Sequence, residues 1–149
     1  MQLNIFTDIA LKSLIYLKQS ERLTTINELA EAFSLPRNHL VKVLNFMVRQ
    51  QWILSVRGRY GGLRYNPVSD TIRLGDIVLT LETKRELLNC QECMIGSCCF
   101  LRGILGEAQA AFYASLNRYT AADLLTPALT TALQPKIIHF QKLVASNLN

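Results

Sequence analysis

Residues 24–50 read TTINELAEAFSLPRNHLVKVLNFMVRQ, and this stretch decides the fold. Thr25 is followed three residues later by Glu28, which is the pattern of a capping box at the start of a helix. We therefore predict a short helix that begins at Ile26 and ends at about Phe33.

A second helix is predicted after the turn Ser34-Leu35-Pro36, because proline is well tolerated at the first position of a helix. It runs from Pro36 to about Gln50, and its buried stripe is expected to be Leu40, Val41, Leu44, Met47 and Val48. Helix, three-residue turn, helix is the spacing of a helix-turn-helix motif. The polar side chains on the opposite face are Arg37, Asn38, Lys42, Asn45 and Arg49, with His39 beside them.

The first turns of this second helix carry residues suited to reading DNA. In helix-turn-helix proteins the N-terminal part of the recognition helix reaches base edges in the major groove. Arginine can bond guanine and asparagine adenine with two hydrogen bonds each, whereas lysine suits phosphates. Arg37, Asn38 and His39 are therefore the base-edge candidates, and Lys42 is a phosphate candidate. A capping or solvated histidine is the alternative for His39.

A β-hairpin is predicted next, with strands over Trp52–Arg57 and Leu63–Asn66 and a turn over Gly58–Gly62. The glycines allow the positive φ angles of a tight turn. A basic hairpin directly after a recognition helix is typical of a wing, and arginine at its tip suits the narrow minor groove. An ordinary surface hairpin is the alternative. The candidate DNA-contacting residues of the predicted wing are Arg57, Arg59, Tyr60 and Arg64.

The net charge of +5 is concentrated on this motif. Residues 32–69 contain six Lys or Arg and no Asp or Glu, whereas the two signs balance over residues 86–149. A local excess of this kind is expected of a nucleic-acid footprint, and a solvated basic face is the alternative. We see neither a signal peptide nor a transmembrane run, so we expect a cytoplasmic protein.

An amphipathic helix is predicted before the motif, over residues 7–17, and a further helix after it, over about 74–81. From Leu101 to Tyr119 apolar residues recur at steps of three and four, and so long a stripe needs a partner. A two-fold dimer through this helix would present two recognition helices to a palindromic operator, with packing inside one chain as the alternative. Thr120 with Asp123 predicts a further short helix.

The expected fold class is mainly α with a small β-hairpin, a winged helix-turn-helix plus a long dimerisation helix. The expected divisions are a DNA-binding domain over 1–82, a cysteine loop over 83–100, and a dimerisation helix with its cap over 101–125. Residues 126–149 form a tail to which we assign no structure.

All four cysteines fall within ten residues, at Cys90, Cys93, Cys98 and Cys99. A thiol cluster on one loop suggests a bound metal or a redox centre. On spacing alone, structural zinc and an iron–sulfur cluster are equally compatible with the C-x-x-C pair. A thiol–disulfide oxidoreductase would carry that pair at a helix start in a βαβ unit, and no such pattern precedes it. We therefore do not expect an enzyme.

An ordered set of motifs at fitting spacing, over residues 1 to about 125, resembles a known family. It is similar to the IscR/NsrR family of winged-helix iron–sulfur transcriptional regulators, and most of all to its nitric-oxide-sensing NsrR branch. The motifs are Phe6-Thr7-Asp8 with Leu11, Pro36–Lys42, Arg57–Gly62, Leu74–Val78, Asn89-Cys90 and Tyr119–Leu124.

The resemblance implies a homodimeric repressor whose iron–sulfur cluster, [4Fe–4S] in preference to [2Fe–2S], maintains the DNA-binding form until nitric oxide destroys it. That branch uses three cysteines and one ligand from outside the loop. The matching residues here are Cys90, Cys93 and Cys99, with Asp8 supplied by the first helix of the other subunit. A regulator that responds to cluster status, iron or redox state, as in the IscR branch, is the alternative.

Three features depart from that branch. Only two residues separate Cys90 from Cys93, which is tighter than usual, and Lys12 stands where arginine is common. Cys98 is an extra thiol beside Cys99, and adjacent cysteines seldom ligate one cluster together because their side chains diverge. Cys98 therefore replaces Cys99, is a spare, or is inert. The exact ligand set and the number of irons stay open.

Overall fold

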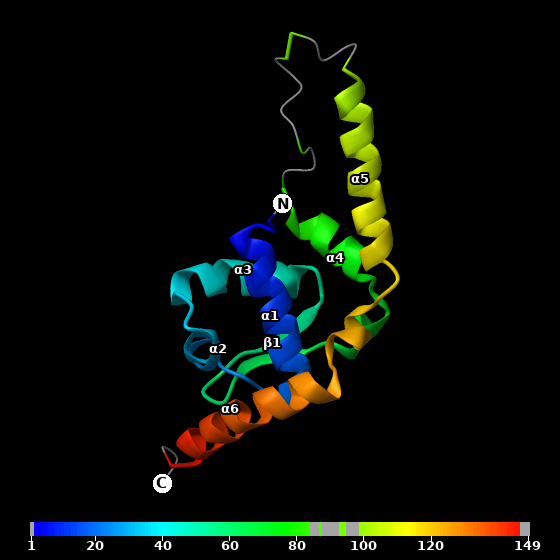
Figure 1. The fold of residues 1–149 in the computed structure, drawn as a ribbon. Coiled ribbons are helices and arrows are strands. Elements are labelled where there is room, and N and C mark those ends of the chain that lie inside the picture. The colour runs from blue at the N-terminus through cyan, green and yellow to red at the C-terminus, as the bar shows by residue number, and fades with distance from the viewer. Residues whose placement is uncertain (1, 84–86, 88–92, 95–98, 147–149) are drawn as a thin grey trace.

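The computed structural model describes residues 2–83, 87, 93–94 and 99–146. Helices α1 (Ile5–Ser20), α2 (Ile26–Phe33) and α3 (Arg37–Arg49) form a three-helix unit, and a hairpin of β1 (Ile53–Val56) and β2 (Gly62–Tyr65) follows it (Figure 1). The remaining elements are η1 (Pro67–Thr71), α4 (Leu74–Leu81), α5 (Phe100–Leu116), η2 (Ala121–Leu124) and α6 (Pro127–Ser146). The prediction of a mainly helical fold with one small hairpin is confirmed.

Helix α1 is longer than predicted at both ends. Asn4 caps it, since its side-chain oxygen accepts a hydrogen bond from the Thr7 backbone N–H at 2.8 Å. At the other end Glu21 adopts a left-handed conformation that stops the helix. Its buried face packs on α3 and includes Ile9, Leu14 and Leu17.

The helix-turn-helix forms where it was predicted, with two corrections. The Thr25 hydroxyl oxygen accepts from the Glu28 N–H at 3.2 Å, which confirms the cap. The prediction that Glu28 completes a capping box is wrong, because its carboxylate points into the protein and binds Tyr16 and Arg22. Pro36 is the residue that precedes α3 rather than its first residue, with ψ at 125°, outside helical values.

The buried stripe of α3 also differs from the prediction, at Val41, Val43 and Val48. Val43 is buried, at 1% exposure, together with Leu40, Leu44 and Met47. Val41 and Val48 are half-buried, because these two residues, seven positions apart, lie together at one edge of the stripe.

The hairpin is antiparallel, with Ile53 opposite Tyr65 and Val56 opposite Gly62. Thr24 pairs with Leu63, so the residue before the N-cap of α2 extends the sheet by one bridge. Gly58 has φ of +112°, and a Cβ on Gly61 would lie 2.2 Å from the Val56 carbonyl oxygen. Gly58 therefore supplies the positive φ that was predicted, whereas Gly61 is required because the Val56 carbonyl leaves no room for a side chain.

Helix α4 occupies the predicted residues and packs on the end of α5. A Cβ on Gly75 would lie 2.8 Å from the Tyr113 carbonyl oxygen, so the two helices approach closely only because this residue is glycine. After α5 the Asp123 carboxylate accepts hydrogen bonds from the Thr120 N–H and hydroxyl at 2.8 and 3.0 Å. The capping box predicted at this position is confirmed.

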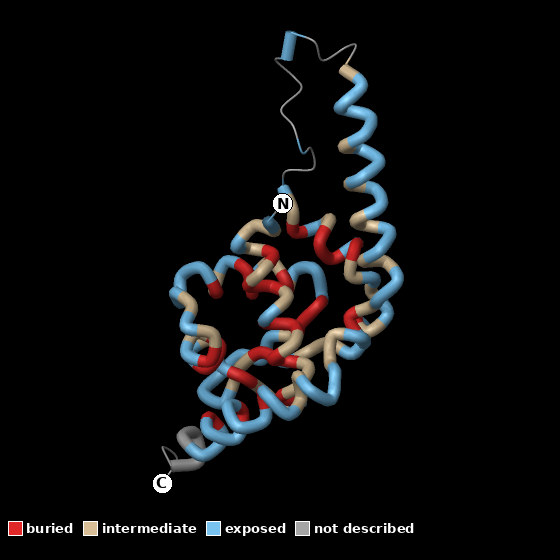
Figure 2. Tube along the Cα trace, in the orientation of Figure 1, coloured by how far each residue is buried: buried red, intermediate tan, exposed pale blue. Residues whose placement is uncertain are grey.

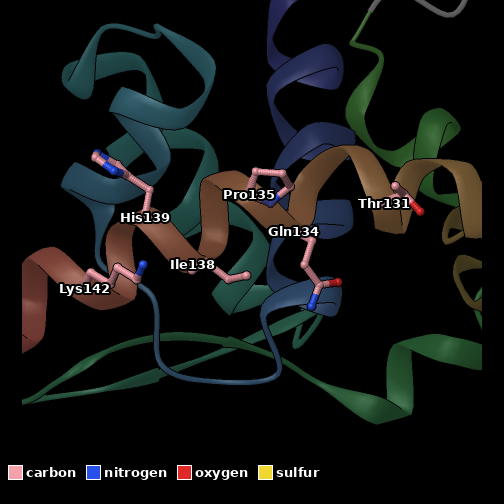
Figure 3. A pocket seen from close by; sticks show the side chains of 6 residues that line it. All are labelled: Thr131, Gln134, Pro135, Ile138, His139 and Lys142. Atoms are coloured by element: carbon pink, nitrogen blue, oxygen red, sulfur yellow. The ribbon is translucent and has the colours of Figure 1, made fainter.

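Helix α6 covers most of the tail to which no structure was assigned. Its inner face buries Leu133, Ile137 and Phe140 against the three-helix unit. Figure 2 marks the buried positions of the chain in red. The Lys136 ammonium donates to the Ala32 carbonyl oxygen at 3.2 Å, at the end of α2. On the outer face, six side chains line a shallow depression of about 550 Å³: Thr131, Gln134, Pro135, Ile138, His139 and Lys142 (Figure 3).

None of the described helices is both long and apolar enough to cross a lipid bilayer.

Candidate functional site

The residues predicted to read bases lie together at the start of α3. Arg37, Asn38, His39 and Lys42 are all exposed on the face that points away from the core. The Arg37 Nε–H donates to the Asn27 side-chain oxygen at 3.0 Å, which links the start of α3 to α2. This bond uses one of the five guanidinium donors and leaves four for another partner.

The wing carries the second group of predicted DNA-contacting residues. Arg57, Arg59 and Arg64 are exposed, and so is Tyr60, at 69%. The Arg59 guanidinium lies 5.7 Å from the centre of the Tyr60 ring, within cation–π range. The hairpin tip thus presents a cation supported by an aromatic ring, a combination that suits a negatively charged groove.

The root of the wing is fixed to α1 by a polar cluster that the sequence did not reveal. Lys18 binds the Asp70 carboxylate and lies 4.7 Å from the centre of the Tyr65 ring. The Tyr65 hydroxyl donates to Asp70 at 2.8 Å. The hydrogen bond from Lys18 lowers the pKa of Asp70, with a further contribution from Tyr65. Burial is the main reason that the pKa of Tyr65 is raised.

A second unpredicted cluster joins α1 to α2. Arg22 forms a two-point ion pair with Glu28, with N–O distances of 3.0 and 2.7 Å. The Tyr16 hydroxyl donates to the same carboxylate at 2.7 Å, and the Glu28 side chain is only 3% exposed. Burial, followed by the bond to Glu28, raises the pKa of Tyr16. This cluster sets the position of α2, on which the turn into α3 depends.

The structure describes two of the four cysteines. Cys93 is exposed, Cys99 is half-buried, and both are free thiols. Cys99 is the residue that precedes α5, and its sulfur makes no capping hydrogen bond. Cys90 and Cys98 lie outside the described residues. Within the part of the chain that is described, no three His, Cys, Asp or Glu side chains come close enough to hold a metal ion.

Asp8, the predicted oxygen ligand, lies one turn into α1. Its carboxylate is 2.6 Å from the Lys12 ammonium, and its side chain is 42% exposed. Asp8 is therefore held by one partner but is open to a second from outside its own chain.

Glu82 connects the cysteine segment (residues 83–99) to the start of α1. Its carboxylate accepts from the Asn4 N–H at 3.0 Å and from the Thr7 hydroxyl at 2.7 Å. The Asn4 side-chain amide also donates to the Leu81 carbonyl oxygen at 3.3 Å. The chain entering the cysteine segment is thus bonded to the cap of α1, immediately before Asp8. No local signal in the sequence points to this contact.

Helix α5 has no buried residue along its 17 positions. Its outward stripe includes Phe100 at 82%, Leu101 at 50% and Ile104 at 48% exposure. Figure 2 shows the helix pale along most of its length, and Figure 1 shows its first turns standing away from the rest of the chain. So much exposed apolar surface on one helix marks an interaction site.

Comparison of the sequence with known protein families identifies the family of this chain. The profile of the Rrf2 family, described as an iron-dependent transcriptional regulator, matches residues 3–127. The chain belongs to the Rrf2 family. Rrf2 proteins are transcriptional regulators, which agrees with the expectation that the chain is not an enzyme.

Solved structures of related regulators share the fold. T. potens IscR is 18% identical, with a TM-score of 0.68 over 86% of this chain and 88% of its own. CymR, the global cysteine regulator of B. subtilis, is 21% identical, with a TM-score of 0.66 over 83% and 95%. The oxidized form of Staphylococcus aureus CymR gives the same identity, TM-score and coverage. At these identities the likeness establishes the winged-helix Rrf2 fold, and helix α6 lies almost wholly beyond the family match.

Proposed function

We propose that this Rrf2 protein is a homodimeric DNA-binding repressor whose operator affinity is controlled by an iron–sulfur cluster sensitive to nitric oxide. The observation that carries the proposal is the position of the cysteines. All four fall between α4, which is bonded to the cap of α1, and α5, the helix with an unpartnered apolar stripe. A change at these thiols would therefore act on both the DNA-binding unit (residues 1–82) and the dimerisation helix (within residues 101–125).

The DNA-binding part rests on the exposed basic face. Arg37, Asn38 and His39 would meet base edges, while Lys42, Arg57 and Arg64 would meet phosphates. Arg59 and Tyr60 at the wing tip would enter the minor groove. Residues 32–69 hold no carboxylate that would oppose the DNA backbone.

The dimer part rests on α5. A single chain leaves its apolar stripe in water, and a two-fold dimer that pairs α5 antiparallel with α5 of a second copy would cover the stripe of both copies. The same two-fold axis would turn two recognition helices towards one palindromic operator.

The residues present fit an iron–sulfur cluster. Cys93 and Cys99 are free thiols, and the Cys99 sulfur is not committed to a capping bond. Cys90, Cys93 and Cys99 would supply three thiolates, and Asp8 of the other subunit the fourth ligand, with Cys98 as the spare thiol. Three thiolates and a weakly bound carboxylate would give an iron that a small diatomic molecule can reach.

The chain's own contacts would carry a change at the thiols to the DNA. Glu82, the residue just before the cysteine segment, is hydrogen-bonded to Asn4 and Thr7, and Asp8 directly follows Thr7 in α1. Helix α1 packs on α3 through Phe6 and Phe46, whose ring centres are 5.5 Å apart. Release of Asp8 or of the segment would therefore reach the recognition helix through packed side chains.

Anaerobic purification followed by an absorbance spectrum and iron, sulfide and zinc analysis tests the cofactor. We expect a coloured protein with iron and sulfide that loses its colour on nitric oxide treatment. A colourless protein with zinc and no sulfide contradicts the proposal in favour of a structural zinc site. A coloured protein whose DNA affinity follows iron supply, and not nitric oxide, favours the cluster-status regulator instead.

A further inference from the structure

A small apolar groove lies between the start of α1 and the recognition helix. It has a volume of about 150 Å³ and is lined by Ile5, Phe6 and Ile9 of α1 and by His39, Lys42 and Val43 of α3. Ile5, an apolar residue at the edge of this groove, is 62% exposed to water. An apolar hollow beside an exposed isoleucine offers a place to bury a side chain from elsewhere.

The side chain that matches this groove in size and chemistry begins α5. Phe100 is 82% exposed, and Leu101 and Ile104 beside it are about half exposed. An apolar cavity of about 150 Å³ accepts one benzene ring. The groove can therefore take the ring of one phenylalanine.

The Phe100 that fills the groove must come from a second copy. Figure 1 shows the first turns of α5 far from α1 and α3 of the same chain. The last turns of α5 are fixed against α4 by the close approach at Gly75, so α5 is not free to swing back. A second copy offers the same side chain, and a two-fold axis makes the exchange reciprocal.

We propose that Phe100 of each subunit inserts into the Ile5–Phe6–Val43 groove of the other. The inference rests on the proposed α5 dimer and names a contact within it. An aromatic side chain buries about 150–250 Å², and a stable interface needs about 800 Å² from each partner. The two rings therefore add to the area that the α5 stripes bury between the two copies, and they are too small to form a stable interface by themselves.

This contact would tie each cysteine segment to the other subunit's DNA-reading surface. Phe6 in the groove packs against Phe46, and Phe46 packs against Trp52 with ring centres 6.0 Å apart. A ring in the groove would extend this aromatic row from the groove to the root of the wing. Since Cys99 immediately precedes Phe100, the thiols of one subunit would control the recognition helix of its partner.

A charge pair tests the contact, because both positions are exposed and tolerate a polar side chain without loss of the fold. The variants are Ile5→Lys and Phe100→Glu, with Val68→Lys as the control, since Val68 is an exposed apolar residue at 72% on η1. Sedimentation equilibrium gives the dimer dissociation constant. Each test variant should raise it at least tenfold and the control less than twofold. An equimolar mixture of the two test variants should recover at least fivefold, because the heterodimer places lysine against glutamate in trans.

The outcomes separate the contact from the dimer itself. A wild-type protein that is monomeric at every concentration contradicts both the α5 dimer and the groove contact. A wild-type dimer whose test variants associate as tightly as Val68→Lys overturns the groove contact alone. Weakened variants that show no recovery on mixing overturn it as well, because the two positions then do not meet across the interface.

Discussion

Replacing Arg22 with methionine would remove one charge from the buried cluster that joins α1 to α2. The guanidinium forms two hydrogen bonds with Glu28, whose side chain is 3% exposed. Removing one member of a buried pair costs about 3–5 kcal/mol, because the other charge is left without compensation. The Arg22 side chain is 25% exposed, so water can enter in part, and Tyr16 still donates to the carboxylate. We therefore expect a loss of about 2–3 kcal/mol.

Urea unfolding followed by the fluorescence of Trp52, the single tryptophan, measures this loss. Lys12→Met is the matched control, because Lys12 and Asp8 form an exposed pair one helical turn apart. It should cost no more than about 0.5 kcal/mol. In the double variant Arg22→Met/Glu28→Gln, much of the loss should be recovered. If Arg22→Met costs no more than Lys12→Met at equal protein concentration, the buried cluster does not position α2 as argued.

Three further predictions concern stability. The folded-state pKa of Asp70 is lowered, so its contribution to stability is complete above its unfolded pKa of about 4 and is lost as the pH falls through the lower folded value. The urea midpoint, measured from pH 2.5 to 7, should therefore fall less steeply with decreasing pH in Asp70→Asn than in the wild type. An equally steep fall in both proteins would refute this. Gly75→Ala should lower the free energy of unfolding, measured by thermal unfolding, by about 1–3 kcal/mol, because the backbone carbonyl beside it cannot give way. Gly103→Ala is the control: its surroundings are open, so it should be neutral or stabilising. Equal effects of the two substitutions would contradict the close approach of α4 and α5. Phe140→Ala should expose α6 to limited proteolysis while the three-helix unit and the hairpin stay protected. An α6 that stays resistant would show that other residues anchor it.

Local signals were enough to predict the elements that lie close together in sequence. The Thr25 cap, the turn before Pro36 and the glycines of the wing each determine backbone geometry within a few residues. The candidate DNA-contacting side chains are exposed on α3 and the wing, as their positions on the predicted helix and hairpin required.

The misses depend on contacts between residues far apart in the chain. Glu28 looked like the second half of a capping box, yet its carboxylate satisfies Tyr16 and Arg22 instead, and no local pattern distinguishes these uses. Glu82 meets Asn4 across 78 residues. Helix α6 was missed because Pro127 and Pro135 suggested breaks. Pro127 is the first residue of the helix, where proline is tolerated, and Pro135 lies on the exposed face, where water can bind the carbonyl that it leaves free.

The central claim is that the thiol segment controls DNA affinity through a cluster. The most direct test is an anaerobic titration of the protein, bound to an operator duplex selected from a random library, with nitric oxide while absorbance and fluorescence anisotropy are recorded together. The account predicts that operator affinity falls at least tenfold in step with loss of the cluster absorbance, and that Cys93→Ala binds at the weakened level from the start. An affinity that stays constant while the cluster absorbance disappears would contradict it.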